Sequence, residues 1–192
     1  VPTLETGVGN CHVYVDQAAD LDMALSVVKD SKLQYVAVCN ACETLLVHEA
    51  IAPALLPGLR QALENTQLRG CEKTRAIIPC EAATEADWDT EYLDRILSIR
   101  VVVSLEEAVE HINAHGSRHT DAIVTGDEAA AAAFLRQVDS AGVYWNCSTR
   151  FADGYRYGFG AEVGVATGKI HARGPVGLEG LTIYKYKLLG QR

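Results

Sequence analysis

Short apolar runs alternate with amphipathic segments along most of the chain. The strand-like runs lie at 11–15, 44–48, 101–103, 121–125 and 142–145. Apolar residues at helical spacing lie between them, at 20–28, 55–63, 104–115 and 127–138. This alternation predicts an α/β domain in which helical crossovers join an open, largely parallel sheet that is covered on both faces. The segment 74–89 follows neither period, and we expect an irregular excursion there.

Capping residues mark two of the predicted helices. Ser104 and Glu107 have the spacing of a capping box, in which each side chain binds a backbone N–H at the start of the helix. Gly116 is a suitable residue to end that helix, and Asp127 is a suitable cap for the Ala-rich helix that follows.

The amino-acid composition of the chain changes after Asn146. Residues 147–180 hold eight glycines and three arginines, and a strand-like pattern covers 181–187. In α/β domains, functional groups lie on loops at the carboxyl ends of strands, so this glycine-rich stretch is expected to be a binding loop. Its arginines Arg150 and Arg173 could each grip a carboxylate or a phosphate, although ordinary surface salt bridges are the alternative.

Composition narrows the class of protein. The chain has 192 residues, 48% of them hydrophobic and 22% charged, which is an ordinary globular balance. Its net charge of −8, from 17 basic and 25 acidic residues, disfavours nucleic acid and anionic membranes as partners. No apolar run is long enough to cross a bilayer and no secretory signal begins the chain, so we expect a cytoplasmic protein with reduced thiols.

Cys39 is the first candidate for chemistry, because it lies in a short connection between a predicted helix and a predicted strand. Backbone N–H groups there can stabilise both a thiolate and an oxyanion, so a nucleophilic Cys39 is expected to have a pKa below that of free cysteine. Two alternatives stay open. Cys39 and Cys42 have the spacing of a zinc or dithiol site, although no second ligand pair complements them, and both could instead be buried thiols.

Three histidines, His111, His115 and His119, form a second cluster in the sequence. His111 and His115 share a helix face, but no HExxH motif is present. A metal site is therefore not predicted, here or elsewhere in the chain.

Five segments, taken together, resemble gamma-glutamyl phosphate reductase, also called glutamate-5-semialdehyde dehydrogenase, of the aldehyde dehydrogenase superfamily. The segments are CNACETLLV (39–47), HTDAIVT (119–125), NCSTRFADG (146–154), GFGAEVG (158–164) and IHARGPVGLEG (170–180). The resemblance covers essentially the whole chain and implies an aldehyde dehydrogenase-like catalytic domain.

The resemblance also implies a reaction. L-Glutamyl 5-phosphate would be reduced by NADPH to L-glutamate 5-semialdehyde and phosphate, a step of proline biosynthesis. Cys39 matches the nucleophile of the family and would form a thioester, with Asn40 supporting the oxyanion through its backbone, while Cys42 is a bystander. A functional link to glutamate 5-kinase and a homo-oligomeric assembly are implied as well.

Further site residues follow from the same resemblance. The substrate side of the family's catalytic domain matches Asn146, Ser148, Thr149, Arg150 and Arg173. The segment LETG (4–7) resembles the superfamily segment that bears a general-base Glu, which makes Glu5 and Gly7 candidates on the cofactor side. An acyl-phosphate reductase needs no base to activate water.

The resemblance divides the chain at residue 160. Residues 1–160 would form the catalytic domain, and residues 161–192 would return toward the cofactor and oligomerisation region through a C-terminal strand. The NADPH-binding half of the family precedes the equivalent of Val1, so we expect the isolated chain to have little reductase activity. The alternative is a non-catalytic assembly fragment that oligomerises through 183–187.

Overall fold

The computed structural model describes residues 7–191, and within them it contains a seven-stranded, wholly parallel sheet. The strands lie in the order β4-β3-β5-β2-β1-β6-β7. Their bounds are β1 Cys11–Val15, β2 Cys42–His48, β3 Gln67–Gly70, β4 Glu81–Ala82, β5 Ile96–Val102, β6 Thr120–Val124 and β7 Gly142–Trp145. The α/β fold with a parallel sheet is confirmed, and the unreadable segment 74–89 contains the short edge strand β4.

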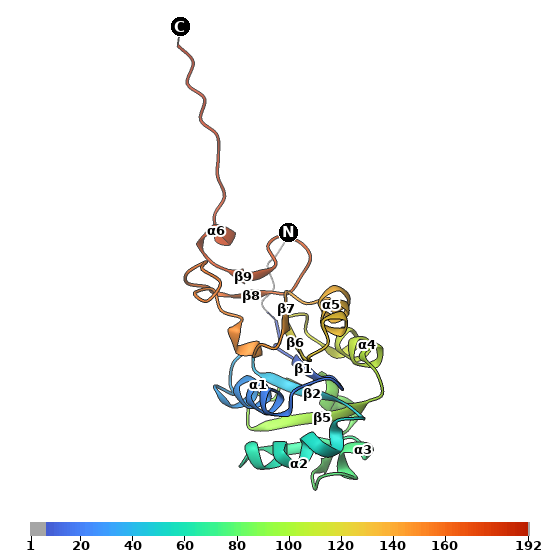
Figure 1. Cartoon of the computed structure of the whole chain (residues 1–192). Helices are drawn as coiled ribbons and strands as arrows, with labels where there is room; N and C mark the ends of the chain where they lie inside the picture. The colour runs from blue at the N-terminus through green and yellow to red at the C-terminus, as the bar shows by residue number, and fades with distance from the viewer. Residues whose placement is uncertain (1–6, 192) are drawn as a thin grey trace.

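Helices cover both faces of this sheet (Figure 1). The bounds of those flanking it are α1 Leu21–Leu33, α2 Ala52–Ala62, α3 Glu72–Arg75, α4 Leu105–His115 and α5 Glu128–Gln137. Residues of α1 and α2 pack with alternate strand residues into one core, and residues of α4 and α5 pack into a second core on the other face. The central strands β1, β2 and β6 are buried along their whole length, as expected of strands covered on both sides.

The caps follow the sequence closely, with one difference. Ser104 accepts a hydrogen bond from the N–H of Glu107, and Asp127 accepts from the first turn of α5. The Glu107 carboxylate, however, accepts from the N–H of Val103 and not from that of Ser104. The extended backbone before α4 brings that earlier N–H to the carboxylate.

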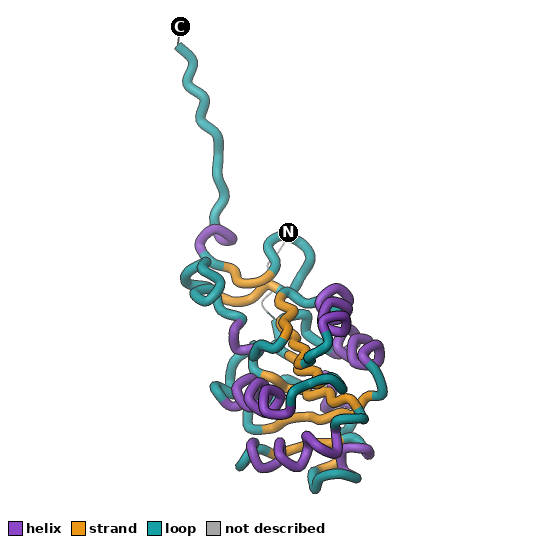
Figure 2. The backbone as a smooth tube through the Cα atoms, in the orientation of Figure 1, coloured by secondary structure: helices purple, strands orange, loops and turns teal. Residues whose placement is uncertain are grey.

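The C-terminal part differs from the prediction. A two-stranded antiparallel sheet joins β8 Gly164–Ala166 to β9 Gly174–Val176, and the short helix α6 spans Leu178–Leu181. The strand predicted at 181–187 is wrong for this structure, because the described residues beyond α6 run away from the sheet without helix or strand (Figure 2). A strand needs hydrogen-bond partners as well as an apolar pattern, and this segment finds none within residues 7–191.

The boundary at residue 160 and the assembly through the C-terminal segment stay predictions. Apolar side chains of that segment, Ile183 and Leu189 among them, are almost fully exposed. No helix within residues 7–191 has the length and apolar character needed to traverse a bilayer.

Candidate active site around Cys39

The candidate nucleophile lies at the amino-terminal edge of the sheet. In a parallel sheet, residues that precede different strands meet at the same edge. Cys39 comes three residues before β2, His119 directly before β6, and Gly9 two residues before β1. This agrees with the predicted place of Cys39 in a connection that leads from a helix into a strand.

The backbone of Cys39 is held from the side of β1. The thiol of Cys11, the first residue of β1, donates to the carbonyl oxygen of Cys39 over 3.3 Å. Gly9 lies so close that a side-chain carbon there would overlap the Cys39 backbone. The chain can pass at this point because Gly9 has no Cβ.

The loop after β7 holds Asn40 from the other side. Thr149 donates its hydroxyl to the carbonyl of Asn40 over 2.7 Å, and the Asn40 side-chain amide donates to the carbonyl of Ala152 over 2.8 Å. The Arg150 guanidinium contacts the side-chain oxygen of Asn40 and donates to that of Gln34 over 3.1 Å. Both ends of the Asn40 side chain are thus used to attach this loop to the segment that carries Cys39.

Ser148 and Thr149 are buried and bind α1. The Ser148 hydroxyl accepts a hydrogen bond from Ser31 over 3.1 Å, and the backbone N–H of Thr149 donates to the same Ser31 hydroxyl over 3.2 Å. These bonds, together with the short 3-10 helix η2 Thr149–Phe151, fix the place of Arg150 beside the Cys39 segment. Of the predicted substrate residues, Ser148, Thr149 and Arg150 are thus brought to Cys39 and Asn40.

Two predicted substrate residues form other contacts. Asn146 exchanges two hydrogen bonds with the backbone of Thr125, of 3.0 and 3.1 Å, and so caps the carboxyl end of β6. Arg173 binds the carboxylate of Asp139 over 3.0 Å and its carbonyl over 3.0 Å. Gly7 is exposed, with open space where a side chain would stand. Glu5 lies outside the described residues.

The electrostatics of Cys39 correct the predicted acidity of its thiol. Burial raises the pKa of Cys39, and the negative charges of Glu162 and Glu91 raise it further. The Arg150 guanidinium and the Cys39 backbone N–H act in the opposite direction and do not offset these effects. The expected pKa below that of free cysteine is therefore wrong, and the resting group is a neutral thiol.

His119 supplies a partner for this thiol that the sequence analysis missed. Its Nε2 lies 3.2 Å from Sγ of Cys39, and its Nδ1 lies 2.9 Å from the hydroxyl of Thr120. Burial lowers the pKa of His119 to about 4. Its place directly before a buried strand was the available clue, because that position puts it at the same sheet edge as Cys39.

Cys39 and Cys42 differ in their surroundings. Cys42 is fully buried and donates its thiol to the carbonyl of Thr44 over 3.3 Å, and burial raises its pKa to about 12. Cys39 is only half-buried and faces His119. Among the residues that the structure describes, no three His, Cys, Asp or Glu side chains are grouped as a metal site requires.

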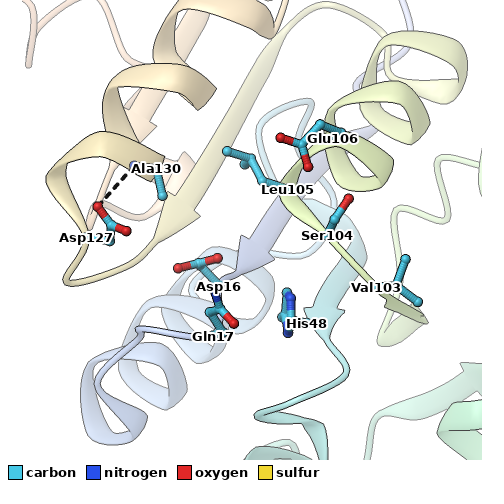
Figure 3. Close-up of a pocket in the computed structure, with 9 residues that line it drawn as sticks. All are labelled: Asp16, Gln17, His48, Val103, Ser104, Leu105, Glu106, Asp127 and Ala130. Carbon is cyan, nitrogen blue, oxygen red and sulfur yellow. Dashed lines mark hydrogen bonds between the residues drawn. The ribbon is translucent and has the colours of Figure 1, made fainter.

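A separate hollow opens at the opposite, carboxyl-terminal edge of the sheet (Figure 3). It is lined by Asp16 after β1, His48 at the end of β2, and Glu106 and Asp127 at the starts of α4 and α5. Three carboxylates and a turn without glycine at 16–20 do not suit the pyrophosphate of a dinucleotide. We therefore assign no cofactor to this hollow.

The fold is that of the aldehyde dehydrogenases. The whole chain superposes on 54% of an acetylating aldehyde dehydrogenase from Geobacillus thermoglucosidasius with a TM-score of 0.72. At 19% identity this likeness establishes the aldehyde dehydrogenase-like fold alone. No family model matches the chain.

Within that class, the chain is similar in sequence to gamma-glutamyl phosphate reductases. It is 62% identical over 192 residues to the gamma-glutamyl phosphate reductase of Acetivibrio thermocellus, with 99% of this chain and 44% of the relative aligned. The crystal structure of the Thermotoga maritima gamma-glutamyl phosphate reductase matches all of this chain and 47% of its own, with a TM-score of 0.94 at 51% identity. The resemblance drawn from the five segments is confirmed. The chain spans less than half the length of these relatives, so their activity comes to it as a proposal.

Proposed function

We propose that this chain supplies the nucleophile and part of the substrate site for the reduction of L-glutamyl 5-phosphate to L-glutamate 5-semialdehyde. The observation that carries the proposal is the setting of Cys39. Its thiol is half-buried where the residues that precede β1 and β6 meet the loop that follows β7. Cys11 and Cys42, by contrast, are fully buried. The similarity to gamma-glutamyl phosphate reductases supports the choice of substrate.

The chemistry of this chain is acyl transfer to sulfur. Sγ of Cys39 attacks the carbonyl carbon of the acyl phosphate, the bond from that carbon to the phosphate oxygen breaks, and phosphate leaves. The thiol proton ends on the phosphate, and a thioester remains on Cys39. Forming a covalent intermediate divides one difficult step into two easier ones.

Reduction of the thioester requires a hydride, which NADPH would supply when bound. The hollow at the carboxyl edge is lined by carboxylates and does not fit a dinucleotide. We therefore derive no step of this chain through the cofactor. Its part is to hold the acyl group on the half-buried Cys39.

Substrate recognition falls first to Arg150. Its guanidinium is half-buried beside Asn40 and interacts electrostatically with Cys39, which suits a positive group that meets an incoming phosphate or carboxylate. Ser148 and Thr149 hold Arg150 in place through Ser31. Arg173 and Asn146, which contact Asp139 and Thr125 here, are the weaker part of the proposed substrate site.

Acylation of the purified chain tests the proposal without any cofactor. L-Glutamyl 5-phosphate is generated in the same solution by glutamate 5-kinase from L-glutamate and ATP. The modified residue is then identified by peptide mass spectrometry. We expect a mass increase of one glutamyl group on Cys39, removed by hydroxylamine as thioesters are.

Two variants make the test specific. Cys39→Ala should abolish the modification, and Cys147→Ser, which changes the exposed thiol, should leave it intact. Folded protein that carries no glutamyl group on Cys39, or carries it equally on several thiols, would overturn the proposal.

A further inference from the structure

Cys39 and His119 form a pair at the amino-terminal edge of the sheet. Nε2 of His119 lies 3.2 Å from Sγ of Cys39, which is hydrogen-bond distance for sulfur. The other ring nitrogen, Nδ1, lies 2.9 Å from the Thr120 hydroxyl. His119 is buried and directly precedes β6 in the chain. His111 and His115, in contrast, lie on α4 and contact each other.

The surroundings keep both members of the pair neutral. Burial lowers the pKa of His119 to about 4, and the nearby Asp121 on β6 opposes this only in part. Burial raises the pKa of Cys39, as do Glu162 and Glu91, while Arg150 opposes them. At neutral pH the pair is therefore a thiol beside a neutral imidazole, and not a preformed thiolate beside an imidazolium.

A neutral imidazole in this place can accept the thiol proton. If Nδ1 carries the ring proton and donates it to the Thr120 hydroxyl, the lone pair of Nε2 points to the thiol. A thiol with a raised pKa needs such an acceptor at the moment of attack, because little thiolate is present beforehand.

We propose that His119 is the acid–base residue that takes the proton of Cys39 and passes it to the departing phosphate. As the bond from Sγ to the acyl carbon forms, Nε2 takes the thiol proton. As the bond from carbon to the phosphate oxygen breaks, the imidazolium gives that proton to the phosphate, which leaves as the monohydrogen ion. His119 is again neutral and the thioester is complete. The phosphate step rests on the proposed function, but proton transfer from Cys39 to His119 does not.

Alkylation of Cys39 by iodoacetamide tests the pair without any substrate. The rate is measured from pH 5 to 9 by peptide mass spectrometry, with Cys147 in the same samples as an exposed reference thiol. In the unchanged chain we expect Cys39 to be alkylated at pH 6.5 well above the rate that its thiolate fraction at that pH would give. We also expect the reaction to be slower in D2O than in H2O. His119→Gln, which keeps a polar group but cannot take a proton, should be on the order of a hundredfold slower there.

His115→Gln serves as the matched control, because His115 bonds Asp89 and makes no contact with Cys39. Its alkylation profile should match that of the unchanged chain, and thermal unfolding checks that both variants fold. An unaltered profile in folded His119→Gln would overturn the proposal. The proposal would also be overturned if the alkylation rate of the unchanged chain rose with pH only as the thiolate fraction rises and was not slowed in D2O. That measurement needs no variant.

The same variants separate the two proposals. If Cys39 reacts with iodoacetamide as expected but gains no glutamyl group from glutamyl phosphate, the proposed substrate fails and the proton transfer to His119 stands. If glutamyl phosphate acylates Cys39 equally fast with and without His119, the proposed function stands and the acid–base role fails.

Discussion

Gly9 lies against the carbonyl and Cα of Cys39, so that a side-chain carbon on Gly9 would occupy the same space as the Cys39 backbone. Gly9→Ala must therefore displace the segment that carries Cys39. We expect a loss of stability on the order of 1–3 kcal/mol, as for other overpacked sites, and slower alkylation of Cys39. Urea unfolding and iodoacetamide labelling measure the two effects.

Gly7→Ala is the matched control for this displacement. Gly7 is exposed, and a Cβ built on it meets no atom within 4 Å. Its substitution should change neither the unfolding free energy nor the labelling of Cys39. Equal effects of the two substitutions would show that the contact between Gly9 and Cys39 is unimportant.

Arg150 and Arg173 should differ in their effect on Cys39. Burial raises the pKa of Cys39, and the guanidinium of Arg150 partly offsets that rise. Arg150→Gln should raise the pKa further and slow alkylation at pH 8 by on the order of threefold to tenfold. Arg173→Gln breaks the contact with Asp139 and should leave the alkylation rate unchanged. A pH profile that shifts equally in both variants would contradict this placement.

The order of strands and helices could be predicted because it depends on local patterns. Alternating apolar runs and the caps Ser104 and Asp127 are properties of neighbouring residues, and the structure confirms the elements they mark. The C-terminal segment at 181–187 shows the limit. Its apolar alternation is that of a strand, but the state of a strand depends on a partner that lies elsewhere, which no local pattern reveals.

The site was predictable only where motif and sheet edge coincide. Cys39, Asn40, Thr149 and Arg150 come from two motifs that the fold brings together. As a candidate for chemistry, His119 enters the sequence analysis only beside His111 and His115, for a metal site, because spacing along the chain suggests no link to a thiol 80 residues away. The raised pKa of Cys39 was missed for a related reason, since burial and the distant Glu162 and Glu91 depend on tertiary packing.

The buried ion pair of Lys32 and Glu43 should be important for stability. Nζ of Lys32 lies 2.5 Å from the Glu43 carboxylate, and neither side chain is exposed to solvent. Lys32→Met leaves the carboxylate buried without its partner and should cost about 3–5 kcal/mol of unfolding free energy. Replacing both residues, as Lys32→Met with Glu43→Leu, should recover most of that loss.

A surface pair provides the control for this prediction. Lys73 and Glu49 lie 2.9 Å apart with about half of each side chain exposed, so Lys73→Met should change stability little. Urea unfolding of all the variants at pH 7 compares the two pairs. A double variant as unstable as Lys32→Met alone would show that the cost arises from packing and not from the unpaired charge.

Acid should destabilise the fold through His111. Burial lowers its pKa to about 2, and the charges that His12, His115 and Arg100 would present lower it in the same direction. Below pH 6.5 the unfolded chain binds a proton at this residue that the folded chain does not, so stability falls as the pH drops from 6.5 toward 2. Between pH 7 and pH 5 the loss should be about 2 kcal/mol for this one histidine. The buried His119, whose pKa burial lowers to about 4, should add a similar loss over the window from pH 6.5 to 4.

His111→Phe isolates this contribution, because it keeps an aromatic ring against Trp88 and removes the proton site. The difference in unfolding free energy between pH 7 and pH 5 should shrink in this variant by about 2 kcal/mol. His171→Gln, at an exposed position, should keep the full difference. Chemical denaturation at the two pH values measures both. If the pH dependence of His111→Phe equals that of the unchanged chain, His111 is not kept neutral by the fold, and the acid sensitivity must arise elsewhere.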